Sequence, residues 1–225
     1  MTNSLNLEIT SKTDQILKKS GVPERYLGYS FANFKQRAGI ETAFSVAKEW
    51  SELPEVKDRG FFLFGTPGIG KTHLAVAALR ARTERMLLQH QENEQQDMYF
   101  DPRTHEERNY VFANVPILLD GLRQSVKYDE SAAQDTFNRC ITTASVVILD
   151  DFGKERATDW ASERLYVLIE SRYQKMLATV VTSNRTLDEL DDLGYGAAVS
   201  RFQQTGRVVY IKSTDYRPEI GPRKG

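Results

Sequence analysis

The feature that most constrains this chain is a glycine-rich stretch, GTPGIGKT, at residues 65–72. It matches the pattern G-x-x-x-x-G-K-[ST] in full and follows the apolar run FFLF at 61–64. From Thr72 on, small and apolar residues recur at helical spacing, so the stretch joins an expected strand to an expected helix. A strand, a glycine-rich turn and a helix in that order form a loop that binds the phosphates of a nucleoside triphosphate.

Each part of this phosphate loop has a physical role. Its glycines allow positive φ, which turns backbone N–H groups toward the anion, and the positive end of the next helix adds to the attraction. Lys71 is expected to reach the β- and γ-phosphates, and the Thr72 hydroxyl to bind Mg²⁺. The expected nucleotide-binding residues are Gly65, Thr66, Pro67, Gly68, Ile69, Gly70, Lys71 and Thr72.

The rest of the chain alternates short apolar runs with amphipathic stretches. Short runs rich in β-branched and aromatic residues are typical of strands buried on both faces. The stretches between them have the apolar spacing of helices, and this alternation predicts an α/β fold with a parallel sheet and right-handed crossovers. The expected strands are FFLF (61–64), YVFAN (110–114), SVVILD (145–150), ATVVTS (178–183) and RVVYI (207–211).

Two of these strands end in polar residues that suit a nucleotide site. Asp150 is expected to orient Mg²⁺, and Asp151 to polarise the attacking water. Asn184 follows the next strand, at the edge of the sheet where ligands bind, and can hydrogen-bond both the γ-phosphate and the water. Arg201 and Arg217, further along, carry planar guanidinium groups that suit the charge of a phosphoryl transition state. Arg201 is expected at the end of a helix.

Five segments, in this order and spacing, carry a resemblance to a known family. They are GTPGIGKTHLAVAALR, VVILDDFGKE, VVTSNR, SRF and TDYR, preceded by the lead-in SGVPERYLGYSFANF. Over roughly residues 17–218 the chain resembles the AAA+ domain of the DnaC/DnaI helicase loaders. The IstB transposition helper proteins are similar over the same stretch.

The resemblance implies an AAA+ P-loop fold whose five-stranded parallel sheet has the order 5-1-4-3-2, between helices and without a C-terminal helical lid. It implies ATP and Mg²⁺ as cofactors and ATP-driven self-assembly. Asn184 would be sensor 1, Arg217 would be sensor 2, and Arg201 would be an arginine finger acting on a neighbouring subunit's nucleotide. The aromatic residues between Tyr26 and Phe34 would pack near the adenine.

The same comparison divides the chain into a short N-terminal tail or helix (1–20), an AAA+ ATPase domain (21–218) and a C-terminal tail (219–225). Only about twenty residues precede the shared segment, fewer than in helicase loaders of this kind. The polar, Gln/Glu-rich stretch 89–109 is expected to be a surface insertion or a frayed helix end. Asp151 stands where most AAA+ proteins have Glu, so we expect slow hydrolysis and a switch rather than a motor.

The expected partners are DNA, single-stranded by preference with duplex possible, and either a replicative helicase or a transposase. Related initiator-type AAA+ proteins face DNA with the helices between the second and third strands. Here that stretch is 116–143, and its candidate phosphate contacts are Arg123, Lys127 and Arg139. Lys154 and Arg156, just after the acidic pair, are further cations that DNA could contact.

Composition and net charge narrow the classes of protein to which this chain can belong. The 225 residues carry a net charge of −1 and one cysteine, Cys140, which excludes a disulfide framework and a constitutively basic nucleic-acid binder. The first twenty residues lack the apolar core of a signal peptide, and no membrane-spanning run is visible, so a cytoplasmic protein is expected. A P-loop kinase for a small molecule is a remote alternative, because such an enzyme would need a substrate lid with clustered arginines and this sequence offers the opposite. An ATP-binding scaffold without ATP turnover would not need all five motif positions, yet all five are intact in this sequence.

Overall fold

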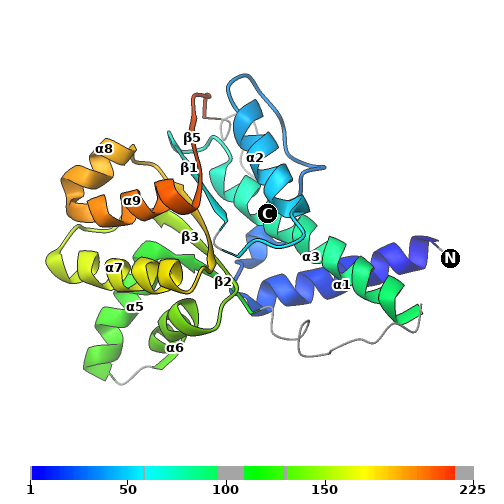
Figure 1. The fold of residues 1–225 in the computed structure, drawn as a ribbon, viewed down its shortest axis with the longest axis horizontal. Coiled ribbons are helices and arrows are strands. Elements are labelled where there is room, and N and C mark those ends of the chain that lie inside the picture. The colour runs from blue at the N-terminus through cyan, green and yellow to red at the C-terminus, as the bar shows by residue number, and fades with distance from the viewer. Residues whose placement is uncertain (1, 58, 96–108, 129–130, 216–225) are drawn as a thin grey trace, which may run out of the picture.

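The structure is a computed structural model that describes residues 2–57, 59–95, 109–128 and 131–215. Its centre is a five-stranded parallel sheet in the order β2-β3-β4-β1-β5, which confirms the expected order read from the other edge (Figure 1). The strands are β1 (Gly60–Gly65), β2 (Tyr110–Asn114), β3 (Val146–Phe152), β4 (Ala178–Ser183) and β5 (Gly206–Ile211).

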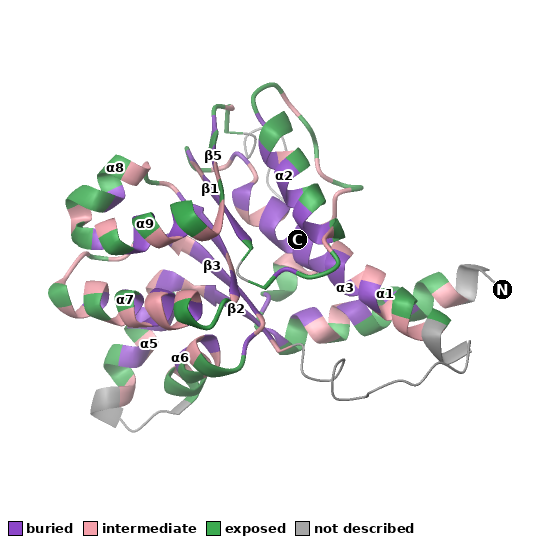
Figure 2. Ribbon diagram, viewed as in Figure 1, coloured by how far each residue is buried: buried purple, intermediate pink, exposed green. Residues whose placement is uncertain are grey.

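Helices cover both faces of the sheet. On one face lie α1 (Thr2–Lys19), α2 (Glu41–Glu52) and α3 (Lys71–Gln95), and a short 3-10 turn (Glu24–Tyr26) comes after α1. On the other face lie α5 (Val115–Tyr128), α6 (Ser131–Thr142), α7 (Asp159–Gln174), α8 (Leu187–Leu190), the π-helical turn Asp191–Tyr195 and α9 (Gly196–Thr205). The result is three layers, with the buried strands between the helices (Figure 2).

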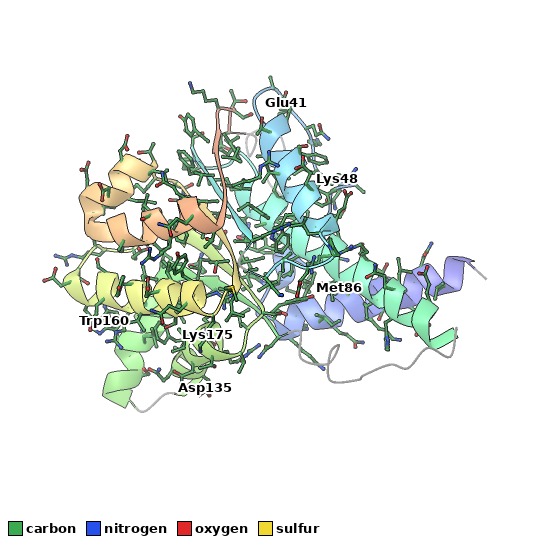
Figure 3. All side chains as sticks on the ribbon, in the orientation of Figure 1. Glu41, Lys48, Met86, Asp135, Trp160 and Lys175 are labelled. Carbon is green, nitrogen blue, oxygen red and sulfur yellow. The ribbon has the colours of Figure 1, made fainter. Side chains whose placement is uncertain are left out.

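Alternation along the strands explains these layers. Phe61 and Leu63 of β1 pack with α2 and α3, whereas Phe62, between them, packs with Phe202 of α9. Successive strand residues point to opposite faces, so a run that is apolar throughout supplies two cores at once. Figure 3 shows side chains filling the space between the strands and both helical layers.

The N-terminal helix is part of the same core. α1 runs beside α3 (Figure 1), and Leu17 is fully buried between them. The chain then turns through Gly21, and the N–H of Phe112 in the edge strand β2 donates to the carbonyl of Ser20 at 2.7 Å. α3 continues to Gln95, so the first part of the expected polar insertion is helical, and residues 96–108 lie outside the described residues.

Arg172 of α7 is a buried charge with a structural role. Its side chain is 1% exposed. The guanidinium donates to the carbonyls of Cys140, Ala144 and Ala178 at 2.6, 2.8 and 2.6 Å, and to the Thr179 hydroxyl at 2.9 Å. Burial lowers its pKa to about 10. The side chain therefore joins the end of α6, the start of β4 and α7.

None of the helices in the described part of the chain combines the length and apolar character that a membrane span needs. After β5, the described residues 212–215 contain no helix.

Candidate nucleotide-binding site

The phosphate loop lies between β1, an interior strand of the sheet, and the start of α3. Gly68 and Gly70 have φ values of 80° and 99°, a left-handed conformation that glycine adopts without strain. A Cβ atom at Gly70 would lie 2.8 Å from the Phe34 ring, so this position also needs a residue without a side chain. The loop conformation therefore depends on its own sequence and on the lead-in segment packed beneath it.

The ammonium group of Lys71 is buried at the centre of the loop. Its Nζ donates to the carbonyl oxygens of Gly65 and Thr66 and to Oδ1 of Asn184, each at 2.8 Å. β1 and β4 are neighbours in the sheet, and this brings Asn184 to the phosphate loop. The structure thus brings Lys71 and Asn184 together, and their roles toward a nucleotide stay predictions.

Oxygen ligands suitable for Mg²⁺ meet beside the loop. The Thr72 and Thr182 hydroxyls both donate to Oδ1 of Asp150 at 2.7 Å, and Asn114 also bonds this carboxyl group. Burial raises the pKa of Asp150, although the hydroxyl hydrogen bonds oppose the shift. A hydroxyl and a carboxylate at one point fit a hard cation that keeps its other positions for water and phosphate. Within the described residues no cluster of three His, Cys, Asp or Glu forms another metal site.

Asp151 lies at an irregularity of the sheet. The expected strand end at Asp150 is wrong by two residues, because β3 continues to Phe152. Its register against β4 shifts between Leu149 and Phe152, and Asp151 has φ of 59°. Such bulges re-aim side chains next to active sites. Asn184 Nδ2 donates to Oδ1 of Asp151 at 3.3 Å, while Lys154 Nζ lies 3.0 Å from Oδ2.

The lead-in segment packs against His73, one residue after the expected magnesium ligand. Tyr29 stacks on the imidazole with ring centroids 4.2 Å apart, and Phe34 meets it edge-on at 5.0 Å. His73 Nε2 lies 3.0 Å from both the Ser30 carbonyl and Asn33 Oδ1, so this nitrogen carries a proton. Burial lowers the pKa of His73. Sequence reasoning missed His73, because nothing in GKTH distinguishes it from an exposed residue.

A surface pocket opens beside the loop, between the lead-in and the end of β5. Arg37, one of its lining residues, donates from Nη1 to the Thr214 carbonyl at 3.0 Å. The Tyr210 side chain, which also lines the pocket, is about half exposed, with Lys212 Nζ 5.7 Å from the ring centroid. The lining residues are Arg37, Ala38, Thr66, Tyr210, Lys212, Ser213 and Thr214.

Arg201 lies within α9, and its contacts are with α7. The expectation of a helix end is wrong, because α9 continues to Thr205. Arg201 Nε lies 2.8 Å from Glu170 Oε2, and the guanidinium stacks on Tyr173 at 4.3 Å. The side chain is still 31% exposed. Arg217 lies outside the described residues, so its role stays a prediction.

The candidate DNA contacts lie on α5 and α6 and bond within the chain. Arg123 donates to the Thr158 hydroxyl at 3.1 Å and lies over the Trp160 ring. Arg139 donates to Asn109 and to the Tyr110 carbonyl. The Lys127 side chain is not among those described. DNA binding by these residues stays a prediction.

Asn114 is a site residue that sequence reasoning missed. It ends the run YVFAN, and its backbone pairs in register with Asp150 of the neighbouring strand. The rule that selected Asn184, a polar residue at the C-terminal end of a parallel strand, would have selected Asn114 as well.

A phosphate loop after β1, and an acidic pair two strands away with β4 between them, define a P-loop ATPase of the AAA+ class. Within this class the chain belongs to the family of the bacterial DnaA ATPase domain, whose sequence profile matches residues 27–210.

Individual relatives agree with this assignment. The chromosomal replication initiator protein DnaA of Onion yellows phytoplasma (strain OY-M) is 23% identical over 192 residues, which are 85% of this chain and 33% of that protein. The chain thus spans about a third of this curated relative's length.

Solved structures share the fold. The crystal structure of the DnaC helicase loader is 23% identical, with a TM-score of 0.65 over 84% of this chain and 100% of that chain. A structure of the replication initiator DnaA bound to AMPPCP and single-stranded DNA is 20% identical, with a TM-score of 0.59 over 83% of this chain and 50% of that chain.

Proposed function

We propose that this chain binds ATP with Mg²⁺, hydrolyses it slowly, and acts as a DNA-associated switch of the helicase-loader kind. The observation that carries the proposal is the meeting of Thr72 and Asp150 at 2.7 Å beside a buried Lys71. These residues would hold a metal ion and triphosphate oxygens together, which is the main requirement for phosphoryl transfer. The likeness to the DnaC helicase loader and to a DNA-bound initiator supports a role in replication.

The residues of the site divide the chemistry among them. Lys71 exchanges its loop carbonyls for β- and γ-phosphate oxygens, and Thr72 and Asp150 hold the metal ion. Bound Mg²⁺ supplies positive charge that neutralises the phosphate oxygens. Asn184 donates to the γ-phosphate, and Asp151 orients the attacking water by accepting its hydrogen bond. Both Asp151 oxygens are already bonded, to Asn184 and Lys154, and this favours slow turnover.

The pocket beside the loop suits the nucleoside. It borders Thr66 of the phosphate loop and offers the exposed face of Tyr210 together with polar backbone from residues 213–214. Apolar surface with a few polar groups is typical of sites for small ligands. We therefore propose that the base lies beside Arg37 and Ala38, just after the aromatic lead-in, whose own rings pack on His73.

Arg201 is proposed to complete the site of a neighbouring subunit. Replacing Arg201 with alanine is expected to leave ATP binding unchanged and to abolish the stimulation of hydrolysis by assembly on DNA, because a finger supplied in trans acts only in the transition state. Phosphate release with and without DNA measures this. Arg207→Ala removes an exposed arginine with its own ion-pair partner, Glu49, and should keep the stimulation. Normal stimulated hydrolysis in Arg201→Ala would show that the finger lies elsewhere.

Binding to a fluorescent oligonucleotide, single-stranded or duplex, tests the switch. The measurement is made with ATP, with ADP and without nucleotide, at one salt concentration, because phosphate contacts depend strongly on salt. We expect ATP-dependent preference for the single strand, with assemblies that dissociate in ADP. ATP-dependent binding to duplex in large assemblies would favour a transposase helper instead. Equal binding in all three nucleotide states would contradict the proposed switch.

A further inference from the structure

A continuous line of hydrogen bonds leads from the phosphate loop to the protein surface. Lys71 donates to Oδ1 of Asn184 at 2.8 Å, and Nδ2 of the same side chain donates to Oδ1 of Asp151 at 3.3 Å. The other Asp151 oxygen, Oδ2, pairs with Lys154 Nζ at 3.0 Å. Three polar groups expected to contact nucleotide or water are thus bonded to one another, and Lys154 is the outer end of the line.

The turn after β3 aims Lys154 at Asp151. The Lys154 N–H donates to the Asp151 carbonyl at 3.2 Å, and the two side chains of this turn meet at 3.0 Å. Glu155 does not compete for the ammonium group, since its carboxylate accepts from the Gly153 N–H at 3.1 Å. Burial raises the pKa of Glu155.

The two partners differ in their freedom to move. The Lys154 side chain is 60% exposed and the Asp151 side chain 25%. A lysine ammonium group on a flexible stem can swing into solvent without disturbing the fold. Asp151 has a constrained backbone, because its own N–H donates to the Thr182 hydroxyl at 3.1 Å.

We propose that Lys154 is a positioning residue that holds the Asp151 carboxylate in a resting orientation and thereby limits ATP hydrolysis. This inference rests on the proposed function, in which Asp151 orients the attacking water. To accept the hydrogen bond of that water, the carboxylate turns toward the γ-phosphate and loses its bond to Lys154. Removing the ammonium group makes this turn easier, and therefore raises the rate rather than lowering it.

The strength of the pair sets the size of the effect. Ion pairs between partly exposed side chains change an equilibrium by roughly fivefold at most. Lys154→Met keeps the length of the stem and removes the charge. We therefore expect kcat to rise roughly two- to fivefold, with KM for ATP unchanged, because the proposed site gives Lys154 no role in holding the nucleotide.

Two variants separate this role from a general effect of charge. Lys154→Arg keeps a cation within reach of Asp151 and is expected to retain the low rate. Lys57→Met removes a lysine of matched exposure, 62%, whose partner is Glu55 in the loop before β1, and should leave kcat as it is. A higher rate in both methionine variants, or an unchanged or lower rate in Lys154→Met, would overturn the inference.

Combination with Asp151→Asn tests whether Lys154 acts through Asp151. If it does, adding Lys154→Met to Asp151→Asn gives no further change in rate, because coupled residues are not additive. A two- to fivefold rise in the double variant as well would overturn the inference. Failure of the proposed function looks different: Asp151→Asn alone would then hydrolyse ATP like the unchanged protein.

A second readout needs no nucleotide. The side-chain amide of Asn184 donates to Asp151, so its NMR signals report the position of that carboxylate in the nucleotide-free chain. We expect these signals to shift in Lys154→Met and to stay in place in Lys57→Met. Unshifted Asn184 signals in Lys154→Met would mean that Lys154 does not set the orientation of Asp151.

Discussion

Replacing Lys71 with alanine is expected to lower the rate of ATP hydrolysis at least about 100-fold, the usual effect of removing one preorganised donor to transition-state charge. ATP binding is expected to weaken as well, because the same ammonium group contacts phosphate oxygens before the reaction begins. The Lys71 side chain is buried, so water does not readily take its place. Phosphate release and titration with a fluorescent ATP analogue measure the two effects.

The control for this variant is Lys48→Ala, which removes an exposed lysine of α2. It should bind and hydrolyse ATP like the unchanged chain. Circular dichroism checks that Lys71→Ala is folded, since its alanine leaves the Gly65 and Thr66 carbonyls without their donor. If the Lys71→Ala protein is folded and hydrolyses ATP at an undiminished rate, the phosphate loop does not take part in the reaction as proposed.

Replacing Arg172 with leucine is expected to lower the free energy of unfolding by about 3–5 kcal/mol. Leucine fills part of the volume but leaves three carbonyls and a hydroxyl without the donor that they share in the interior. For a chain of this size each kcal/mol lowers Tm by about 2–4 °C, so a fall of roughly 6–20 °C follows. Urea and thermal unfolding measure both quantities.

Arg164→Leu, on the same helix, is the matched control. Its side chain is 37% exposed and pairs with Glu163, so the free energy of unfolding should change by less than about 0.5 kcal/mol. Arg172→Lys is expected to recover only part of the lost free energy of unfolding. One ammonium group cannot reach acceptors on α6, on the loop that follows α6 and on β4 at the same time. If Arg172→Leu loses under about 1 kcal/mol, the carbonyls have found other donors.

The local pattern of apolar and polar residues was sufficient to predict much of this fold. Every expected strand is present, because short apolar runs bounded by polar residues have few other structures open to them. The phosphate loop and Asp150 were predictable for a related reason. Their chemistry requires particular residue types at fixed spacing, and the edge rule for parallel sheets then brings Asn184 to the same place. The strand order came from the family resemblance.

Contacts between distant segments were not predictable in this way. Arg172 occupies an ordinary position in a helical pattern, and its role depends on three carbonyls that are brought together only by the fold. The stack of Tyr29 on His73 joins residues 44 positions apart. Arg123 likewise donates to the Thr158 hydroxyl and lies over the Trp160 ring, contacts that its place in the sequence does not reveal.

The position of β1 between β4 and β5 has a consequence for synthesis on the ribosome. β1 is made first among the strands, yet both of its neighbours, β4 and β5, are made last. About 110 residues separate β1 from β4, which translation covers in roughly 5 to 20 s. α2 and α3 can cover Phe61 and Leu63 during that time, but Phe62 stays uncovered until α9 has been made. A nascent chain that stalls before residue 178 therefore exposes an apolar strand with two open edges, the form most prone to aggregate.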